Sequence, residues 1–74
     1  MTNQRSPKLF GLVAVLNPPT GSDLEIGDVG TVVELLPPDG VEVEFLDPGG
    51  RTRCVETFSF ADVLVLNRER TQVA

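Results

Sequence analysis

The chain has no histidine, no tryptophan and no tyrosine, and it has one cysteine, Cys54. Without histidine neither a Ser/His/Asp set nor a Cys/His pair can form, and the most common general base is missing. A single cysteine excludes an internal disulfide and the zinc sites that are built from paired cysteines. We therefore expect a protein that is not an enzyme and binds no metal or other cofactor, with Cys54 as a small buried apolar side chain.

Basic residues are also few, since 6 lysines and arginines stand against 11 aspartates and glutamates and give a formal net charge of −5. Affinity for nucleic acid depends largely on Lys and Arg side chains that neutralise phosphates, so this composition disfavours a nucleic-acid partner. A partner protein with a basic or neutral surface is favoured instead.

Long apolar runs are missing as well. No segment approaches the roughly 20 apolar residues of a membrane-spanning helix. The N-terminal segment has a basic start and a short apolar run, like a signal peptide, but no small-x-small cleavage site follows the run. We therefore expect a cytoplasmic protein that contacts no membrane.

What the sequence does contain is a series of short segments rich in β-forming residues and separated by turns. The clearest covers residues 41–46, in which Val41, Val43 and Phe45 alternate with Glu42 and Glu44. This period of two predicts a strand with one buried and one solvated face. We expect further strands over residues 9–16, 29–36, 51–58 and 63–66, a 3₁₀ turn over 59–62, and flexible tails over 1–8 and 67–74.

Glycine and aspartate mark the turns between these segments. We expect Gly27 and Asp28 to form a turn before residues 29–36, and Gly30 to permit a close backbone approach in that strand. A phosphate-binding loop is disfavoured there, because the segment continues into β-branched residues instead of opening a helix. The other expected turn residues are Asp39 and Gly40 in one hairpin and Gly49 and Gly50 in the next.

Five short strands with one 3₁₀ turn before the last predict an all-β chain with a single domain over residues 9–66. A small five-stranded SH3-like barrel accommodates these elements in the fewest residues. Closure or near closure of the barrel would remove exposed strand edges. Its core would be formed by valine, leucine and isoleucine together with the four phenylalanines.

Two regions are candidates for contact with a partner protein. The loop over residues 17–27 occupies the place of the long first loop of such a barrel, and loops on a rigid scaffold often carry recognition. The second region is the solvated face of residues 41–46, where we expect arginines of the next strand to lie opposite the glutamates. The candidate contact residues are Asp23, Glu25, Glu42, Glu44, Arg51 and Arg53.

Self-association is a further alternative, because residues 12–16 are apolar on both faces of the expected first strand. If a minimal barrel covers one face of that strand, the other face forms an apolar patch suited to a homo-oligomer. Bending of the strand would instead bury both faces.

The segment IGDVGTVVELLPPDGVEVEFLDPGGRT resembles a bacterial family of small proteins known only as a domain of unknown function. The shared features are a Gly-Asp-x-Gly-Thr-Val step, a Val-Glu-Phe strand, an Asp-x-x-Gly-Arg-Thr turn and an Ala-Asp-Val segment, here residues 27–32, 43–45, 47–52 and 61–63. The resemblance covers residues 9–66 and implies an SH3-like barrel without an assigned activity. Some members look like small partners encoded beside toxin-like or other enzymes, which implies an accessory or antitoxin-like protein.

The same glycine-rich step is similar to that of KOW-type SH3-like modules, which implies RNA binding as the alternative function. Those modules usually carry Lys and Arg around the step, whereas this chain has Glu25, Asp28 and Glu34. A third alternative is a site for Ca²⁺ or Mg²⁺, because acidic side chains alone can hold a hard cation. The sequence favours a non-catalytic protein–protein interaction module over both.

Overall fold

The computed structural model describes residues 5–66 of the chain. Residues 1–4 of the first expected tail and all of the second, 67–74, lie outside the described residues. The elements are β1 (Leu12–Val15), β2 (Val29–Leu36), β3 (Gly40–Leu46), β4 (Thr52–Ser59), the 3₁₀ turn η1 (Phe60–Asp62) and β5 (Val63–Val65). The described chain is thus all-β and has no α-helix, as the sequence predicts.

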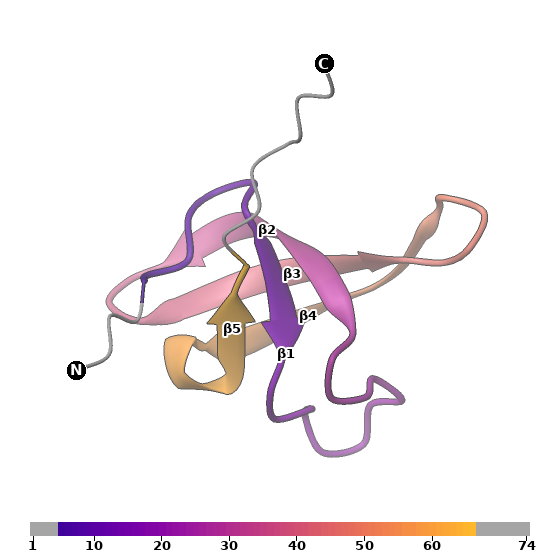
Figure 1. Ribbon diagram of the computed structural model, residues 1–74, viewed down its shortest axis with the longest axis horizontal. Helices are drawn as coiled ribbons and strands as arrows, with labels where there is room; N and C mark the ends of the chain where they lie inside the picture. The colour runs from indigo at the N-terminus through magenta and orange to yellow at the C-terminus, as the bar shows by residue number, and fades with distance from the viewer. Residues whose placement is uncertain (1–4, 67–74) are drawn as a thin grey trace.

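The five strands form one antiparallel sheet in the order β4-β3-β2-β1-β5 (Figure 1). Consecutive strands pair from β1 to β4, and β5 returns to pair with the free side of β1. The 3₁₀ turn expected before the last strand is present. Its cap is Ser59, whose hydroxyl oxygen accepts a hydrogen bond from the backbone N–H of Ala61 at 3.2 Å.

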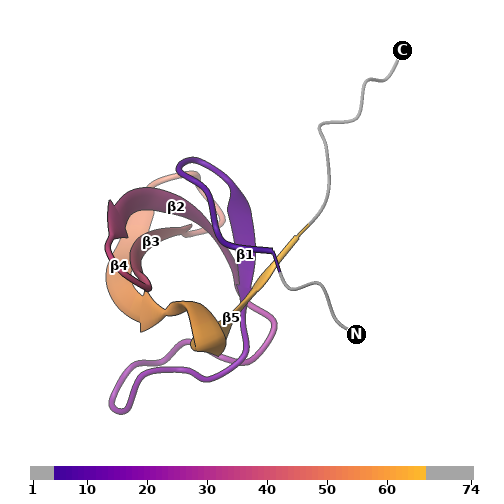
Figure 2. The same cartoon turned by 90° about the vertical axis from the view of Figure 1, so that its left-hand side faces the viewer.

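The sheet curls strongly around its core but does not close (Figure 2). Its edge strands are β4 and β5, so the expected closure of the barrel is not present. The three residues of β5 pair with β1 alone. The 3₁₀ turn η1 connects β4 to β5, and within it the N–H of Phe60 donates to the carbonyl oxygen of Asp39 at 2.8 Å.

The first strand is shorter than expected, because residues 9 and 10 form a turn before it, although the backbones of Phe10 and Gly11 still hydrogen-bond to Val32 of β2. Phe10 has a positive φ of 67°, and the N–H of Gly11 donates to the carbonyl oxygen of Lys8 at 2.8 Å. Phe10 is 71% exposed, so this phenylalanine does not join the core as the sequence predicts. Pro7, just before the turn, is buried.

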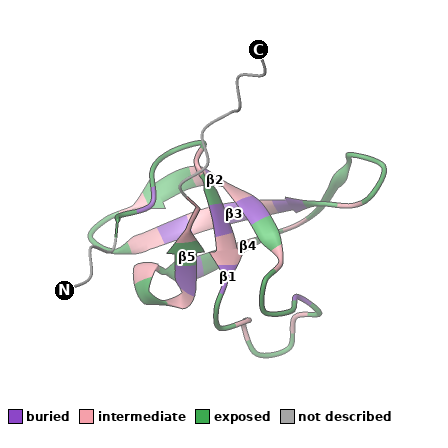
Figure 3. Ribbon diagram, viewed as in Figure 1, coloured by how far each residue is buried: buried purple, intermediate pink, exposed green. Residues whose placement is uncertain are grey.

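The core lies on the concave side of the sheet and is formed by apolar side chains from all five strands and the β1–β2 loop. Its buried residues are Val13, Val15, Leu24, Val32, Val41, Val43, Phe45, Phe58 and Val63. The alternation predicted for residues 41–46 is confirmed, since buried and half-buried positions alternate along β3 (Figure 3). Phe45 and Phe58 meet edge to face with ring centroids 6.0 Å apart, which adds about 0.5–1.5 kcal/mol to their burial.

Two bulges interrupt the ladders and decide which side chains face the core. One lies in β2 between Val32 and Glu34, and the other lies where β3 meets β4, between Phe45 and Leu46. A bulge inserts one residue into a strand, so the residues beyond it change face relative to strict alternation. Both bulges affect residues of the candidate site.

Candidate functional site

The second bulge directs Arg53 toward the β1–β2 loop. Cys54 pairs with Phe45 and Thr52 pairs with Leu46, which leaves Arg53 as the inserted residue of β4. The guanidinium Nη2 lies 2.9 Å from Asp23 Oδ1. Nη2 also lies 3.3 Å from the carbonyl oxygen of the same aspartate. The arginine therefore fastens the loop to the edge of the sheet.

A second aspartate completes this cluster. Asp28 Oδ2 lies 3.8 Å from Nη1 of Arg53 and accepts a hydrogen bond from the N–H of Glu25 at 2.9 Å. Gly27, with a φ of 95°, makes the turn between them. Leu24 is buried in the core and anchors the same loop from the inside. Asp23, in the loop over residues 17–27 that was predicted as a contact region, and Asp28, just after that loop, thus hold the loop in place.

The expected pairing of Arg51 and Arg53 with the glutamates of β3 is wrong. The register places Thr57 opposite Glu42 and Val55 opposite Glu44. The arginines lie elsewhere because Arg53 occupies the bulge and because Arg51 belongs to the turn before β4 begins at Thr52.

Asp47 organises that turn between β3 and β4. Its Oδ1 accepts hydrogen bonds from the N–H groups of Gly49 and Arg51, each at 2.9 Å, and its carbonyl oxygen accepts from Gly50, also at 2.9 Å. Gly50 has a φ of 86°, which favours glycine. At the other hairpin, the turn between β2 and β3 contains Asp39, and Gly40 is the first residue of β3. Gly30 lies inside β2 and is buried against β3.

We call the side of the sheet that points away from the core the outer face. Glu42 and Glu44 of β3 lie on it, and two threonines of β4 orient them. Thr57 Oγ1 donates to Glu42 Oε2 at 2.9 Å, and Thr52 Oγ1 donates to Glu44 Oε2. Both predicted glutamates are thus held on the surface of the sheet.

Glu34 joins them on the outer face, although the sequence does not predict it as a site residue. It lies directly opposite Glu42 in the β2–β3 ladder. Strict alternation would place Glu34 on the core side together with Val32, but the bulge at Val33 reverses this. We call Glu34, Glu42 and Glu44 the acidic zone. No basic side chain within residues 5–66 pairs with it.

An apolar row lies beside the acidic zone on the same face. It consists of Leu12, Ala14, Val29 and Leu64, in which Ala14 pairs with Val29 on one side and with Leu64 on the other. Val13 and Val15 of β1 are buried, so the two faces that the sequence shows to be apolar have different environments. The exposed fractions of Leu12, Val29 and Leu64 are 41%, 51% and 46%, so no described element covers the row.

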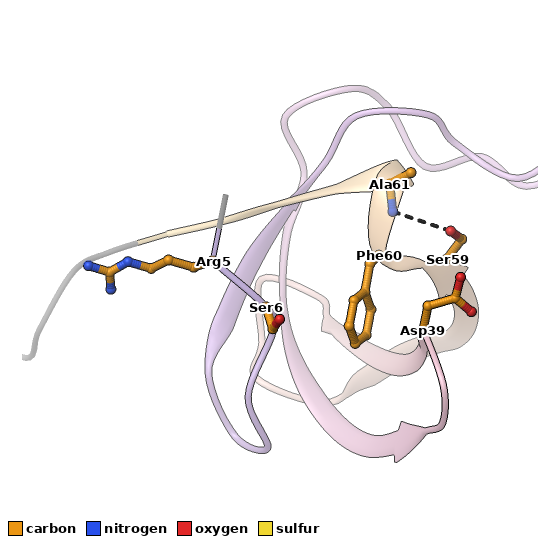
Figure 4. A pocket seen from close by; sticks show the side chains of 6 residues that line it. All are labelled: Arg5, Ser6, Asp39, Ser59, Phe60 and Ala61. Atoms are coloured by element: carbon orange, nitrogen blue, oxygen red, sulfur yellow. Dashed lines mark hydrogen bonds between the residues drawn. The ribbon is translucent and has the colours of Figure 1, made fainter. Parts of the chain in front are cut away.

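A shallow pocket of about 360 Å³ lies at one end of the sheet, between the β2–β3 turn and η1 (Figure 4). Asp39, Ser59 and the Phe60 ring line one side, and Ser6 of the N-terminal segment faces the ring. The Arg5 side chain points away from the ring (Figure 4). The pocket is open to solvent, and none of the residues predicted for partner contact lines it.

Cys54 is half-buried and packs against the core, so its burial is less complete than expected. Burial raises the pKa of the thiol, and the nearby Glu56 carboxylate raises it further, while Arg53 acts in the opposite direction. The thiol is therefore mainly protonated near neutral pH, which makes it a weak nucleophile.

Residues 5–66 contain no group of three acidic, cysteine or histidine side chains arranged to hold a metal ion. Within the same residues there is no helix of the length and apolarity that crossing a membrane requires.

The comparisons with known proteins identify a family and nothing closer. No curated protein and no solved structure matches the chain. The family model described as a domain of unknown function, DUF4926, matches residues 9–65, which include all five strands and η1. The chain therefore belongs to this family of unknown function.

Proposed function

We propose that the protein is a non-catalytic protein–protein interaction module, a small accessory or antitoxin-like partner of another protein. The observation that carries this proposal is the apolar row on the outer face, which residues 5–66 leave uncovered. Single exposed apolar side chains are normal, but a contiguous row on a sheet of this size is typical of a surface that a partner covers.

We further propose that the curled sheet is an SH3-like barrel that remains open at one seam. Four features support it: the long loop between β1 and β2, the tight β2–β3 and β3–β4 hairpins, η1 just before the last strand, and the pairing of β5 with β1. The family resemblance of residues 27–32 and 47–52 supports the same fold and a bacterial origin. The single cysteine fits a cytoplasmic location, where disulfides are rare.

RNA binding of the KOW type receives no support from the arrangement of charges. Arg53 is engaged by Asp23 and Asp28, so its guanidinium is already neutralised by the protein itself. The glycine-rich step lies beside these aspartates instead of beside a group of basic side chains. Phosphates would meet negative charge there.

The proposal is tested by purifying the tagged chain from its native host under gentle conditions. We expect one partner protein to be recovered in a fixed stoichiometry, and the same complex to form when the partner carries the tag. The matched control is the chain with Leu64→Ser, which alters the apolar row without touching the core. Equal recovery of every protein by the wild-type chain and by this variant would contradict the proposal.

A further inference from the structure

The acidic zone and the apolar row form one continuous surface, and the following inference rests on the proposed function. Thr31 of β2 pairs with Leu12 on one side and with Glu44 on the other. Side chains of directly paired residues lie about 5 Å apart on the same face of a sheet. The row and the zone are therefore neighbours across β1, β2 and β3, and one partner surface can cover both.

The acidic zone contains an arrangement that disfavours the isolated fold. Glu34 and Glu42 lie directly opposite each other, and like charges in this position destabilise a sheet. No basic side chain within residues 5–66 relieves the repulsion. In most of a natural protein, local interactions favour the folded structure. A local interaction that opposes folding is therefore typical of a functional site.

The carboxylates are also oriented before any partner arrives. Thr57 holds Glu42 and Thr52 holds Glu44 through hydrogen bonds to one oxygen of each carboxylate. An ionised carboxylate has about four acceptor positions, so each can still accept hydrogen bonds from a cation. Side chains that are ordered in advance lose less entropy when a partner binds.

We propose that the outer face binds a partner protein of a different sequence, which places Lys or Arg side chains against Glu34 and Glu42 and apolar side chains against the row. Charge complementarity selects this occupant over a second copy of the chain. Two copies that meet through this face bring two acidic zones close together, and each chain has a net charge of −5. Repulsion between like charges disfavours such a dimer.

A peptide of alternating lysine and leucine serves as a defined probe for this surface. Titrated into the ¹⁵N-labelled chain, it is expected to shift backbone amide signals of β1, β2, β3 and β5, the strands that carry the apolar row and the acidic zone. A peptide of alternating lysine and glutamine presents the same charge without apolar side chains and is expected to bind more weakly. Shifts confined to the β1–β2 loop or to the pocket beside Phe60 would overturn the proposal.

Two matched variants then separate the face from the loop. Glu34→Gln removes a charge from the acidic zone, and Glu25→Gln removes the same charge from the β1–β2 loop. We expect Glu34→Gln to weaken peptide binding by about two- to fivefold, which corresponds to the loss of one exposed ion pair. We expect Glu25→Gln to leave peptide binding nearly unchanged. The reverse order, or an equal loss in both variants, would show that net charge or the loop governs binding and would overturn the proposal.

Three further outcomes are distinguishable. Amide shifts on the outer face that depend on protein concentration without peptide would identify a second copy as the occupant and overturn the choice of a different partner. If the tagged chain recovers a stoichiometric partner while the peptide does not bind the outer face, this surface is wrong and the proposed function still holds. Failure to recover any partner would contradict the proposed function and, with it, the inference that rests on it.

Discussion

Replacing Gly30 with alanine adds a methyl group where β2 packs closely against β3. A Cβ at this position would lie 2.6 Å from Val43 Cγ1, 2.7 Å from the carbonyl oxygen of Glu44 and 2.8 Å from Phe45 Cε2. Optimal separations between carbon atoms are about 3.5–4.0 Å, so roughly 1 Å of space is missing on three sides at once. The carbonyl group belongs to β3, which pairs with strands on both sides, and it cannot retreat without disturbing the ladders.

The cost follows from comparison with other overpacked cores. An extra methylene in a well-packed interior destabilises a protein by about 1–3 kcal/mol. In a domain of this size each kcal/mol lowers the melting temperature by about 4–8 °C, so we expect Gly30→Ala to melt about 4–24 °C below the wild type. The chain has neither tryptophan nor tyrosine, so far-UV circular dichroism or calorimetry is a better measurement than intrinsic fluorescence.

Gly49→Ala is the matched control. A Cβ on Gly49 would have one neighbour within 4 Å, Asp47 Oδ1 at 3.4 Å, and this residue has no positive φ. We expect its melting temperature to equal that of the wild type or to rise slightly, since alanine restricts the unfolded chain more than glycine does. If Gly30→Ala melts within the error of Gly49→Ala, the close packing of β2 on β3 does not limit this position and the reasoning is refuted.

Three further predictions concern charged and reactive groups. Glu34→Gln removes the repulsion with Glu42 across the ladder, so we expect the free energy of unfolding to rise by about 0.2–1 kcal/mol. A decrease measured by urea denaturation would contradict repulsion between the two glutamates. Arg53→Gln removes the ion pairs with Asp23 and Asp28. Because these pairs are exposed, we expect the free energy of unfolding to fall by at most about 1 kcal/mol, and by less at high salt. A decrease that does not depend on salt would contradict an electrostatic role and indicate lost packing. The raised pKa of Cys54 predicts that alkylation by iodoacetamide reaches its full rate at a higher pH than for a free cysteine. If the rate reached half its maximum at the same pH as for free cysteine, or at a lower pH, burial would not raise the pKa of this thiol.

The parts of the fold that could be predicted are those in which the local pattern of apolar and polar residues alone determines which side chains are buried. In residues 41–46 the alternation of valine and phenylalanine with glutamate leaves one register that buries the apolar side chains, and β3 adopts it. The cap of η1 was also predictable, because a serine hydroxyl accepts a hydrogen bond from the next turn by local geometry alone.

The bulges were not predictable, because their cause is the fit between strands and not the local sequence. Residues 29–36 read as a regular strand, yet the bulge at Val33 moves Glu34 to the outer face. The bulge at Arg53 has a similar effect. Arg53 was expected to pair with the glutamates of β3, but it instead binds Asp23 of the β1–β2 loop. A shift of one residue exchanges the two faces of a strand, so a small error in register changes the whole candidate site.

The aspartates of the turns and the glutamates of the acidic zone have different roles. This difference shows which negative charges are available to bind a partner. Asp28 and Asp47 accept hydrogen bonds from backbone N–H groups of their own turns. A short aspartate side chain reaches its own turn readily, so its charge serves the fold. The three glutamates of the acidic zone instead lie within β2 and β3, where they are not needed to complete a turn. Removal of charge from the turn aspartates should therefore lower stability, whereas removal from the acidic zone should preserve or raise stability and weaken binding. A variant series measured by both denaturation and peptide titration separates these effects, and a glutamate variant that lost stability and kept its affinity would refute this division.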